Sequence, residues 1–147
     1  MAASGATGPA RVIDGVAAAR EVYARLRERV AALGRVNIRP ALTAVLVGDN
    51  PVSRVYLRNK TRACEEAGVR SEVLELPASC PPRTLLAALE KLNADPGVHG
   101  ILVQLPLPQP LDASLVAQSV APAKDVDGLS WHNLGALMAG QPLFEPC

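Results

Sequence analysis

Aromatic side chains are scarce in this chain of 147 residues, which has two tyrosines, one tryptophan and one phenylalanine. Hydrophobic residues nevertheless make up 49% of the sequence, so we expect a core built from Leu, Val, Ile and Ala. The length fits one domain of ordinary size.

An excess of charge of either sign is also lacking, since the formal net charge is +1 at pH 7. This balance provides no strongly basic surface of the kind that binds nucleic acid or an anionic membrane. The longest apolar runs are strand-sized and fall well short of the roughly 20 residues that a membrane-spanning helix needs. We therefore expect neither nucleic acid nor a membrane as a partner.

Cysteines are few, and Cys64, Cys80 and Cys147 form no CxxC pair. Their number and spacing indicate neither a disulfide framework nor a zinc site, and they favour a reducing, cytoplasmic compartment. Residues 1–10 are rich in Ala, Gly, Ser and Thr and lack the charged start and apolar stretch of a signal peptide. We expect a disordered tail over 1–10 and one domain over 11–147.

Metal ligands are equally sparse. His99 and His132 have no partners at ligand spacing. Asp125 and Asp127 are spaced like the opening of a calcium-binding loop, but the remaining ligands of such a loop are absent. A turn is the better interpretation, and we expect no metal site.

Apolar spacing and capping residues predict an alternation of strands and helices along the chain. The expected helices cover 14–33, 51–67, 82 to the turn at 95–97, 112–120 and 133–138, and the expected strands cover 42–47, 73–76 and 98–104. Such alternation predicts a three-layer α/β/α domain, in which helices cover both faces of a mostly parallel sheet.

The carboxyl ends of parallel strands are where ligands bind in sheets of this kind. Segment 48–56 leaves the first predicted strand at that edge, and segment 104–106 leaves the third. The two segments are therefore expected to lie close together and to contribute to one site.

The predicted helix over 51–67 carries three polar side chains on one side. Because a helix turns about 100° per residue, Ser53, Tyr56 and Lys60 fall within about 60° of one another. We expect the opposite, solvent-exposed side to hold Arg54, Arg58, Arg62 and Glu65, and the inward half to hold Val52, Tyr56, Lys60, Ala63 and Ala67.

Lys60 is the unusual member of that inward half. Removal from water favours the neutral form of a lysine, and such a lysine can exchange a proton near neutral pH. The alternative is that Lys60 lies across the helix edge and reaches water with its long stem. The spacing alone does not separate these two interpretations.

Four sequence segments, in order, resemble the signatures of the methylenetetrahydrofolate dehydrogenase/cyclohydrolase family. The first, residues 47–60, has a Ser-x-x-Tyr-x-x-x-Lys pattern on a helix that follows a Val-Gly-Asp turn. The other three are GILVQLPLP at 100–108, PAKDVDG at 122–128 and FEPC at 144–147. The resemblance extends from about residue 11 to the end of the chain.

This resemblance implies an enzyme of folate-linked one-carbon metabolism, which supplies purine biosynthesis. It would oxidise 5,10-methylenetetrahydrofolate to 5,10-methenyltetrahydrofolate with NADP, and then hydrolyse the methenyl compound to 10-formyltetrahydrofolate. Both reactions would share one cleft between two domains of a protein that is usually a homodimer.

The resemblance also assigns roles by position. Lys60 matches the catalytic lysine that assists the attack of water on the methenyl carbon, and Gln104 matches the glutamine that bonds near this lysine. Tyr56 matches the tyrosine that stacks on the substrate's rings, and Asp127 the aspartate that grips the pterin. Ser53 matches a supporting serine. The plain structural alternatives are a strand-end glutamine bonded to a loop backbone and a serine of a first helical turn.

A glycine-rich nucleotide fingerprint is absent from the sequence. The fold expected from the resemblance therefore lacks the family's C-terminal Rossmann domain, and no residue of this chain is expected to bind NADP. One alternative is a folate-binding module or inactive fragment without turnover. A second is the substrate domain of a different two-domain dehydrogenase, and the Tyr-x-x-x-Lys and Lys-Asp-Val-Asp-Gly segments together argue against it.

Overall fold

The computed structural model describes residues 12–142, which contain five helices and three strands. The predicted tail over 1–10 and the segment 144–147 lie outside the described residues. The elements in chain order are α1 (Gly15–Gly34), β1 (Ala41–Val47), α2 (Pro51–Ala67), β2 (Arg70–Leu76), α3 (Pro82–Ala94), β3 (Gly100–Val103), α4 (Ala113–Gln118) and α5 (Trp131–Met138).

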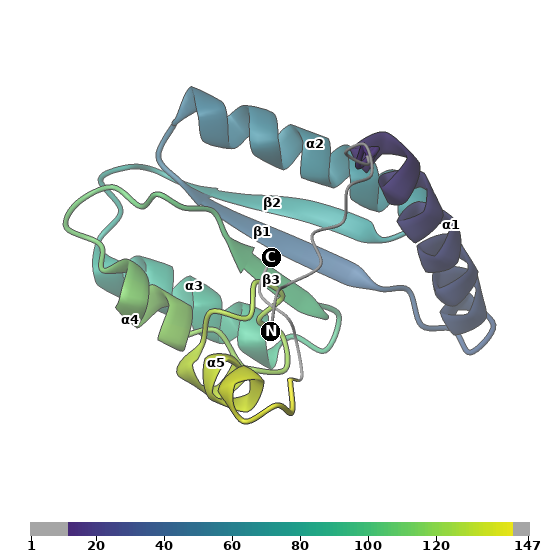
Figure 1. Ribbon diagram of the computed structural model, residues 1–147. Coiled ribbons are helices and arrows are strands. Elements are labelled where there is room, and N and C mark those ends of the chain that lie inside the picture. The colour runs from purple at the N-terminus through teal and green to yellow at the C-terminus, as the bar shows by residue number, and fades with distance from the viewer. Residues whose placement is uncertain (1–11, 143–147) are drawn as a thin grey trace, which may run out of the picture.

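The three strands form one parallel sheet in the order β2-β1-β3. Figure 1 shows α2 on one face of this sheet and α3 and α4 on the other. The predicted three-layer α/β/α class is thus confirmed, and the described sheet is entirely parallel.

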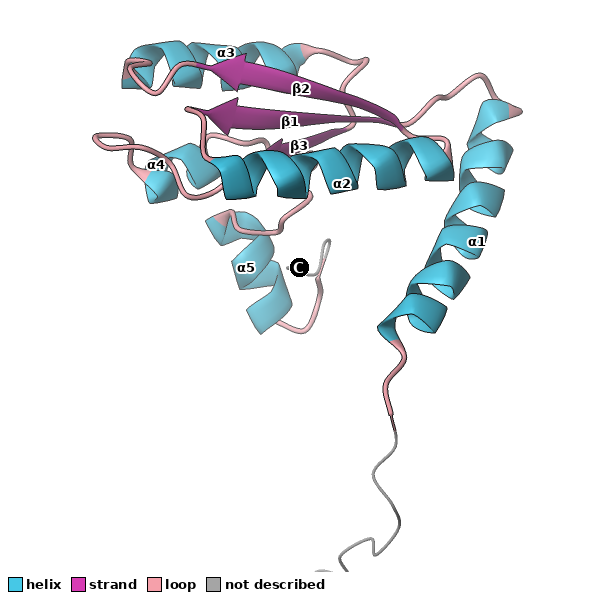
Figure 2. Ribbon diagram, turned by 90° about the horizontal axis from the view of Figure 1, so that it is seen from above, coloured by secondary structure: helices cyan, strands magenta, loops and turns pink. Residues whose placement is uncertain are grey.

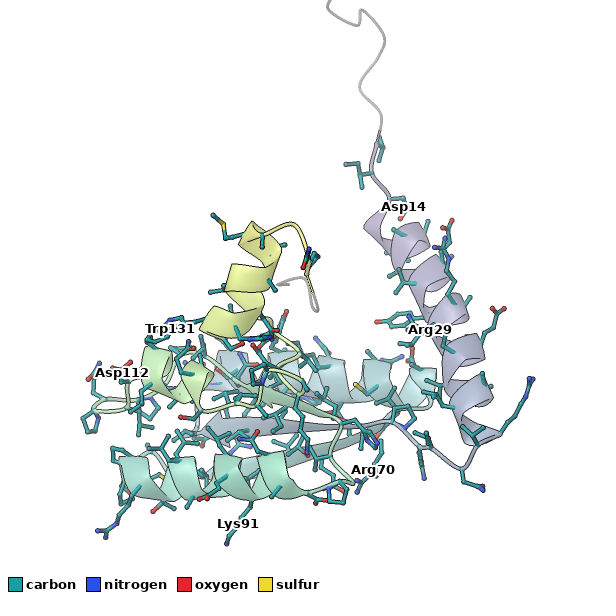
Figure 3. The ribbon with its side chains drawn as sticks, turned by 90° about the horizontal axis from the view of Figure 1, so that it is seen from below. Asp14, Arg29, Arg70, Lys91, Asp112 and Trp131 are labelled. Carbon is teal, nitrogen blue, oxygen red and sulfur yellow. The ribbon has the colours of Figure 1, made fainter. Side chains whose placement is uncertain are left out.

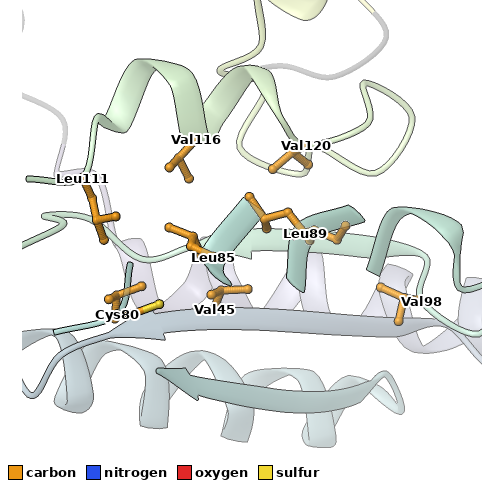
Figure 4. Packing of buried hydrophobic residues seen from close by; sticks show 10 residues of the cluster. Val45, Cys80, Leu85, Leu89, Val98, Leu111, Val116 and Val120 are labelled. Carbon is orange, nitrogen blue, oxygen red and sulfur yellow. The ribbon is translucent and has the colours of Figure 1, made fainter. Parts of the chain in front are cut away.

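Each face of the sheet has its own core because successive residues of a strand point to opposite sides. Val45 and Val47 of β1 pack against α3 and α4, whereas Ala44 and Leu46 pack toward Leu57 of α2. Figure 4 shows the larger of the two clusters, in which helix residues of α3 and α4 meet β1. Its labelled members include Leu85, Leu89, Val116 and Val120.

Helix α2 begins and ends where the sequence predicts. The side chain of Asn50 accepts hydrogen bonds from the N–H groups of Val52 and Ser53 at 2.9 and 3.2 Å, and Pro51 occupies the first turn. Gly68 ends the helix with φ of +82°, a conformation that glycine adopts without steric cost. These capping residues set the two ends of α2, the helix that carries Ser53, Tyr56 and Lys60.

Helix α1 stands apart from the sheet, with Asp14 at its far end (Figures 2 and 3). No residue of α1 is fully buried. The helix contacts the C-terminal end of α2, where the Arg27 side chain donates a 2.9 Å hydrogen bond to the Glu66 carbonyl. Apolar side chains of α1, including Val22 at 60% exposure, therefore face solvent.

Several predicted boundaries were wrong by a few residues, and helix α4, predicted over 112–120, covers only Ala113–Gln118. Strand β2 begins at Arg70 rather than residue 73, because its charged first residues still pair with β1, starting with Ala41 opposite Arg70. Strand β3 covers only Gly100–Val103, inside the predicted 98–104. Helix α5 begins two residues early, because the Ser130 side chain accepts a hydrogen bond from the Asn133 N–H and caps it.

Trp131, the first residue of α5, lies at the surface near α4 (Figure 3). It is 71% exposed, and its backbone N–H donates a 2.8 Å hydrogen bond to the Gln118 side chain. Among residues 12–142, no helix is both long enough and apolar enough to cross a membrane.

The loop that follows α4 returns to the sheet and pairs with β3. The Ile101 N–H donates to the Lys124 carbonyl at 2.7 Å, and Ile101 and Asp125 form a parallel bridge. This close approach requires a glycine at position 100, since a Cβ there would lie 2.6 Å from the Cγ1 atom of Val126. The loop segment over 124–128 is thereby fastened to the third strand.

Gly100→Ala should lower the free energy of unfolding by about 1–3 kcal/mol, because the added methyl group collides with a stiff, β-branched side chain. Urea denaturation checks this. Gly135→Ala in α5 is the matched control, since nothing lies within 4 Å of its new methyl group. It should be neutral or raise stability by up to about 1 kcal/mol, and equal effects of the two substitutions would contradict the proposed crowding.

Candidate functional site

A hollow of about 220 Å³ lies at the carboxyl edge of the sheet, between α2, the end of β3 and the loop after α4. It contains four of the five residues singled out in the sequence. Its lining is Tyr56, Lys60, Leu102, Val103, Gln104, Leu105, Asp127 and Leu129. Residues from three separate parts of the chain thus meet where ligands bind in parallel sheets.

Lys60 and Tyr56 are adjacent on α2, one turn apart. The Lys60 Nζ atom lies 4.9 Å from the centre of the Tyr56 ring, within the range of a cation–π contact. Lys60 is half-buried, and no ion pair reaches it within residues 12–142. The ammonium group therefore stands at the hollow with an aromatic ring beside it.

The predicted inward face of α2 was partly wrong. Tyr56 is 55% exposed and Val52 is 78% exposed, and the buried residues of α2 are Ser53, Leu57 and Ala67. The helix rests on the sheet along that line, so Tyr56 and Lys60 lie at its rim, over the hollow. The predicted solvent side is confirmed, since Arg54, Arg58, Arg62 and Glu65 are all exposed.

Gln104 follows β3 directly and has one satisfied and one unsatisfied end. Its Nε2 group donates a 2.8 Å hydrogen bond to the Leu105 carbonyl, which is the loop contact that the structural alternative anticipated. Its Oε1 atom is buried and has no hydrogen-bond partner among the described residues. A buried acceptor without a partner is costly, and this one belongs to a residue that lines the hollow.

Asp127 contributes a carboxyl group that the fold does not use. It is half-buried, and none of the hydrogen bonds within residues 12–142 involves its side chain. Burial raises the pKa of Asp127; the Lys60 ammonium lowers it, and the charge of Asp125 raises it further. The net effect is a raised pKa, as expected for a carboxylate that is partly removed from water and that no hydrogen bond within the described residues stabilises.

Asp125, two residues earlier, points into the protein instead. Burial alone would raise the pKa of Asp125, but hydrogen bonds from the Ser130 backbone and the Asn133 side chain outweigh it and leave this pKa lowered. The Asp125 carboxylate is 2.8 Å from the Ser130 nitrogen and 3.0 Å from the Asn133 Nδ2 atom. The predicted turn is present, and within the described residues this aspartate serves the loop.

Ser53 is the predicted site residue that the hollow does not include. It is buried in the first turn of α2, where its N–H donates to the Asn50 side chain. This position corresponds to the structural alternative stated for Ser53. In the described part of the chain, no group of three or more His, Cys, Asp or Glu residues could hold a metal ion.

The sequence reasoning missed the apolar lining of the hollow and the buried Asn133. Leu102 and Val103 belong to a predicted strand, but their exposure to a hollow depends on where α2 crosses the sheet. Asn133 carried a usable signal, because a serine three residues before it is typical of a helix N-cap. Nothing local in the sequence connects Asn133 to Asp125.

A larger groove of about 700 Å³ lies between α2 and β2, away from these residues. Two of its arginines, Arg54 and Arg62, form ion pairs. Arg54 makes two 2.9 Å hydrogen bonds to Glu75 and also contacts Asp49, and Arg62 contacts Glu66 at 2.9 Å. The pairing with Arg54 lowers the pKa of Glu75, and the groove contains none of the five residues singled out in the sequence.

Comparison with known proteins agrees with the motifs in the sequence. The sequence profile described as "Tetrahydrofolate dehydrogenase/cyclohydrolase, catalytic domain" matches residues 13–127. The bifunctional protein FolD of Bordetella avium is 52% identical over 138 residues, which cover 94% of this chain and 49% of that protein. The chain therefore spans about half the length of the curated relatives it matches.

Solved structures match this chain over a similar share of its length. The bifunctional enzyme FolD of Campylobacter jejuni has a TM-score of 0.89 and 41% identity, over 91% of this chain and 48% of that one. The methylenetetrahydrofolate dehydrogenase-cyclohydrolase of Trypanosoma brucei, solved with NADP cofactor and inhibitor, has a TM-score of 0.88 and 36% identity over 94% and 48%. The family expected from the four sequence segments is confirmed: this chain belongs to the tetrahydrofolate dehydrogenase/cyclohydrolase family, and residues 13–127 correspond to its catalytic domain.

Proposed function

We propose that this chain is the folate-binding and catalytic half of a bifunctional enzyme. The whole enzyme oxidises 5,10-methylenetetrahydrofolate to the methenyl compound and hydrolyses that compound to 10-formyltetrahydrofolate. The observation that carries the proposal is the meeting of Lys60, Tyr56, Gln104 and Asp127 around one hollow.

The hollow suits a flat heterocycle that carries hydrogen-bond donors on one edge. The half-exposed Tyr56 ring offers a stacking surface, and the leucine and valine side chains of the lining exclude water from the ring faces. The Asp127 carboxylate has two free acceptor oxygens, which match the amino and ring N–H donors of a pterin. We assign substrate binding to Tyr56 and Asp127, with Lys60 and Gln104 at the reacting end. For Ser53 we retain only an indirect role through the first turn of α2.

Lys60 supplies the acid–base chemistry of the hydrolysis. As a water oxygen bonds to the methenyl carbon, the lysine amine accepts a proton from that water. The resulting ammonium returns this proton to the ring nitrogen as the bond between this nitrogen and the carbon breaks, which leaves the formyl group on the other nitrogen. The second proton of the water, on the hydroxyl group of that carbon, passes to solvent as the carbonyl forms, so the hydrolysis of the cationic methenyl compound releases one proton. The free Gln104 Oε1 atom is the acceptor that orients the ammonium or the water.

The described residues do not fit NADP. The turn after β1 holds Asp49, whose negative charge opposes a phosphate, and the Asn50 side chain already occupies the first N–H groups of α2. The loop after β3 is proline-rich. The Trypanosoma brucei relative was solved with NADP, and this chain covers 48% of it. We therefore assign NADP to the half that this chain does not cover, and hydride transfer to the complete enzyme alone.

A second candidate function is folate binding without turnover. The binding groups Tyr56 and Asp127 face one hollow regardless of whether Lys60 acts on a substrate. Hydrolysis of the methenyl compound separates the two candidates. We further infer a cytoplasmic location from the free thiols of Cys64 and Cys80, and a homodimer for the complete enzyme from its family.

Lys60→Ala should reduce hydrolysis of 5,10-methenyltetrahydrofolate by this chain at least about 100-fold, toward the buffer rate, because the proton acceptor is lost. The decrease in methenyl absorbance measures the rate. Arg58→Ala, on the exposed side of the same helix, should leave the rate unchanged. A wild-type chain no faster than buffer would favour the binding-module alternative, and full hydrolysis by Lys60→Ala would remove Lys60 from its role.

Asp127→Ala should weaken folate binding by about 1–3 kcal/mol, the range of hydrogen bonds to a charged group. Isothermal titration of the chain with folic acid measures the dissociation constant. Glu90→Ala, an exposed carboxylate of α3, is the control for the loss of one negative charge. The assignment of Asp127 fails if both variants bind folic acid as the wild-type chain does.

The two aspartates should affect stability with opposite signs. The pKa of Asp127 is raised by burial, so its contribution to stability is present below the unfolded pKa of about 4 and is lost as the pH rises through the folded pKa. Asp127→Asn should therefore raise the urea midpoint at pH 7 and have little effect below about pH 3.

Asp125→Asn is the matched comparison. Despite the opposing effect of burial, hydrogen bonds to Ser130 and Asn133 lower the pKa of Asp125, so its stabilisation is present above the unfolded pKa and is lost as the pH falls through the folded pKa. This variant should lower the urea midpoint at pH 7, and the loss should fade in acid. Shifts of the same sign at both positions would contradict the different environments described.

A further inference from the structure

We propose that Asn133 of α5 is a positioning residue for the site: it holds Asp125, and through Asp125 it sets the turn that directs the Asp127 carboxyl toward Lys60 and Tyr56. The consequence for substrate binding rests on the function proposed above. The consequence for the geometry of the turn does not depend on any ligand.

Asn133 is completely buried, although it lies on a short helix near the surface. Its side-chain amide donates two hydrogen bonds, both of 3.0 Å, to the Pro122 carbonyl and to the Asp125 carboxylate. The two acceptors lie three residues apart at the beginning of the loop. One side chain therefore fixes the path of the chain into the Asp127 turn.

A closed set of hydrogen bonds joins the turn to the start of α5. The Asp125 carboxylate also accepts from the Ser130 N–H at 2.8 Å, and the Ser130 hydroxyl accepts from the Asn133 N–H at 3.3 Å. Asp125, Ser130 and Asn133 are all buried. Hydrogen bonds shielded from water in this way resist opening.

Asp127 depends on this network because it has no anchor of its own. No side-chain hydrogen bond holds its carboxyl group within residues 12–142. Its backbone is fixed from both sides, by the bridge between Asp125 and Ile101 and by the Gly128 N–H, which donates to the Asp125 carbonyl at 3.2 Å. The direction of the carboxyl group therefore follows the backbone of the turn, which Asn133 holds at Asp125.

Asn133 also carries a cost that plain packing would avoid. Its Oδ1 atom is buried with no hydrogen-bond partner in the described part of the chain. A leucine has nearly the same size and would bury no unpaired oxygen. The two hydrogen bonds that the Asn133 amide donates to the loop offset this cost.

Hydrogen exchange and carboxyl titration of the ligand-free chain test the proposal directly. The charged groups near Asp127 are Lys60 from α2 and Asp125 within the turn, and both remain in the variant Asn133→Ala. We expect the N–H groups of Gly128 and Ser130 to exchange at least about tenfold faster in this variant. The carbon-13 titration midpoint of the Asp127 carboxyl should fall toward its ordinary value as the turn opens to solvent.

The matched control is Asn93→Ala. Asn93 of α3 is also an asparagine with two side-chain hydrogen bonds in this region, but both are to backbone groups: it donates to the Ser119 carbonyl at 2.8 Å and accepts from the Ala121 N–H at 2.9 Å. It should leave the exchange of Gly128 and the titration of Asp127 unchanged. If Asn133→Ala fails to fold, Asn133→Leu fills the same volume and takes its place. Unchanged exchange and titration in the folded variant, or equal changes in Asn93→Ala, would overturn the proposal.

A double-mutant cycle connects the turn to the ligand. With folic acid as the probe, Asn133→Ala should raise the dissociation constant about tenfold in the wild-type background and less than about twofold when Asp127 is already Asn. For p-aminobenzoylglutamate, which lacks the pterin, the change should stay below about twofold in both backgrounds. Additive effects on folic acid binding would overturn the positioning role. If the wild-type chain does not bind folic acid, the proposed function fails, while exchange and titration still decide the role of Asn133.

Discussion

The close approach of the loop over 124–128 to β3 is the constraint on which the site depends. It is possible because Gly100 leaves room for Val126, and the backbone bonds of Ile101 then fasten the loop to the sheet. Without this contact, Lys60 and Tyr56 would stand on α2 without a facing wall. With it, a carboxyl group distant in sequence lies across the same hollow as the lysine.

The two acidic residues of the turn, Asp125 and Asp127, have different roles: Asp125 stabilises the turn, and Asp127 lines the hollow. The Asp125 carboxylate accepts hydrogen bonds that hold the turn, whereas the half-buried Asp127 carboxylate has no hydrogen-bond partner within residues 12–142. The same contrast occurs at Gln104, whose amide nitrogen is bonded and whose oxygen is free. Unsatisfied polar atoms around a hollow reduce the stability of the empty protein and are available to a ligand.

Local signals in the sequence were sufficient for the order of elements, the parallel sheet and both ends of α2. Asn50, Pro51 and Gly68 act on neighbouring residues, so their effects can be read without knowing the fold. The end of β3 and the start of β2 could not be read this way, because pairing between strands decides them. The orientation of Tyr56 was misjudged because the helix meets the sheet along Ser53 and Leu57, a line set by tertiary packing.

Helix spacing and the shared edge of the sheet were enough to expect Tyr56, Lys60 and Gln104 close together, and all three line one hollow. Asp127 and the roles of the four residues entered only through the resemblance. The hydrogen-bonded set around Asp125 could not be predicted, because its members interact across a turn whose shape comes from β3. Ser53 is a site residue that the sequence predicted and that the hollow does not include. Its place on the expected side of α2 was compatible with a site role, but the described structure has it in the first helical turn, outside the lining.

Trp131 gives this corner of the molecule an optical property of its own. It is the single tryptophan of the sequence, it is largely exposed at the first position of α5, and it lies two residues before Asn133. Its intrinsic fluorescence therefore reports on the junction between α4, the Asp127 turn and α5, rather than on the interior of the domain. An emission maximum already near that of free indole would make global denaturation nearly silent in this signal, while quenching would follow local events at the junction.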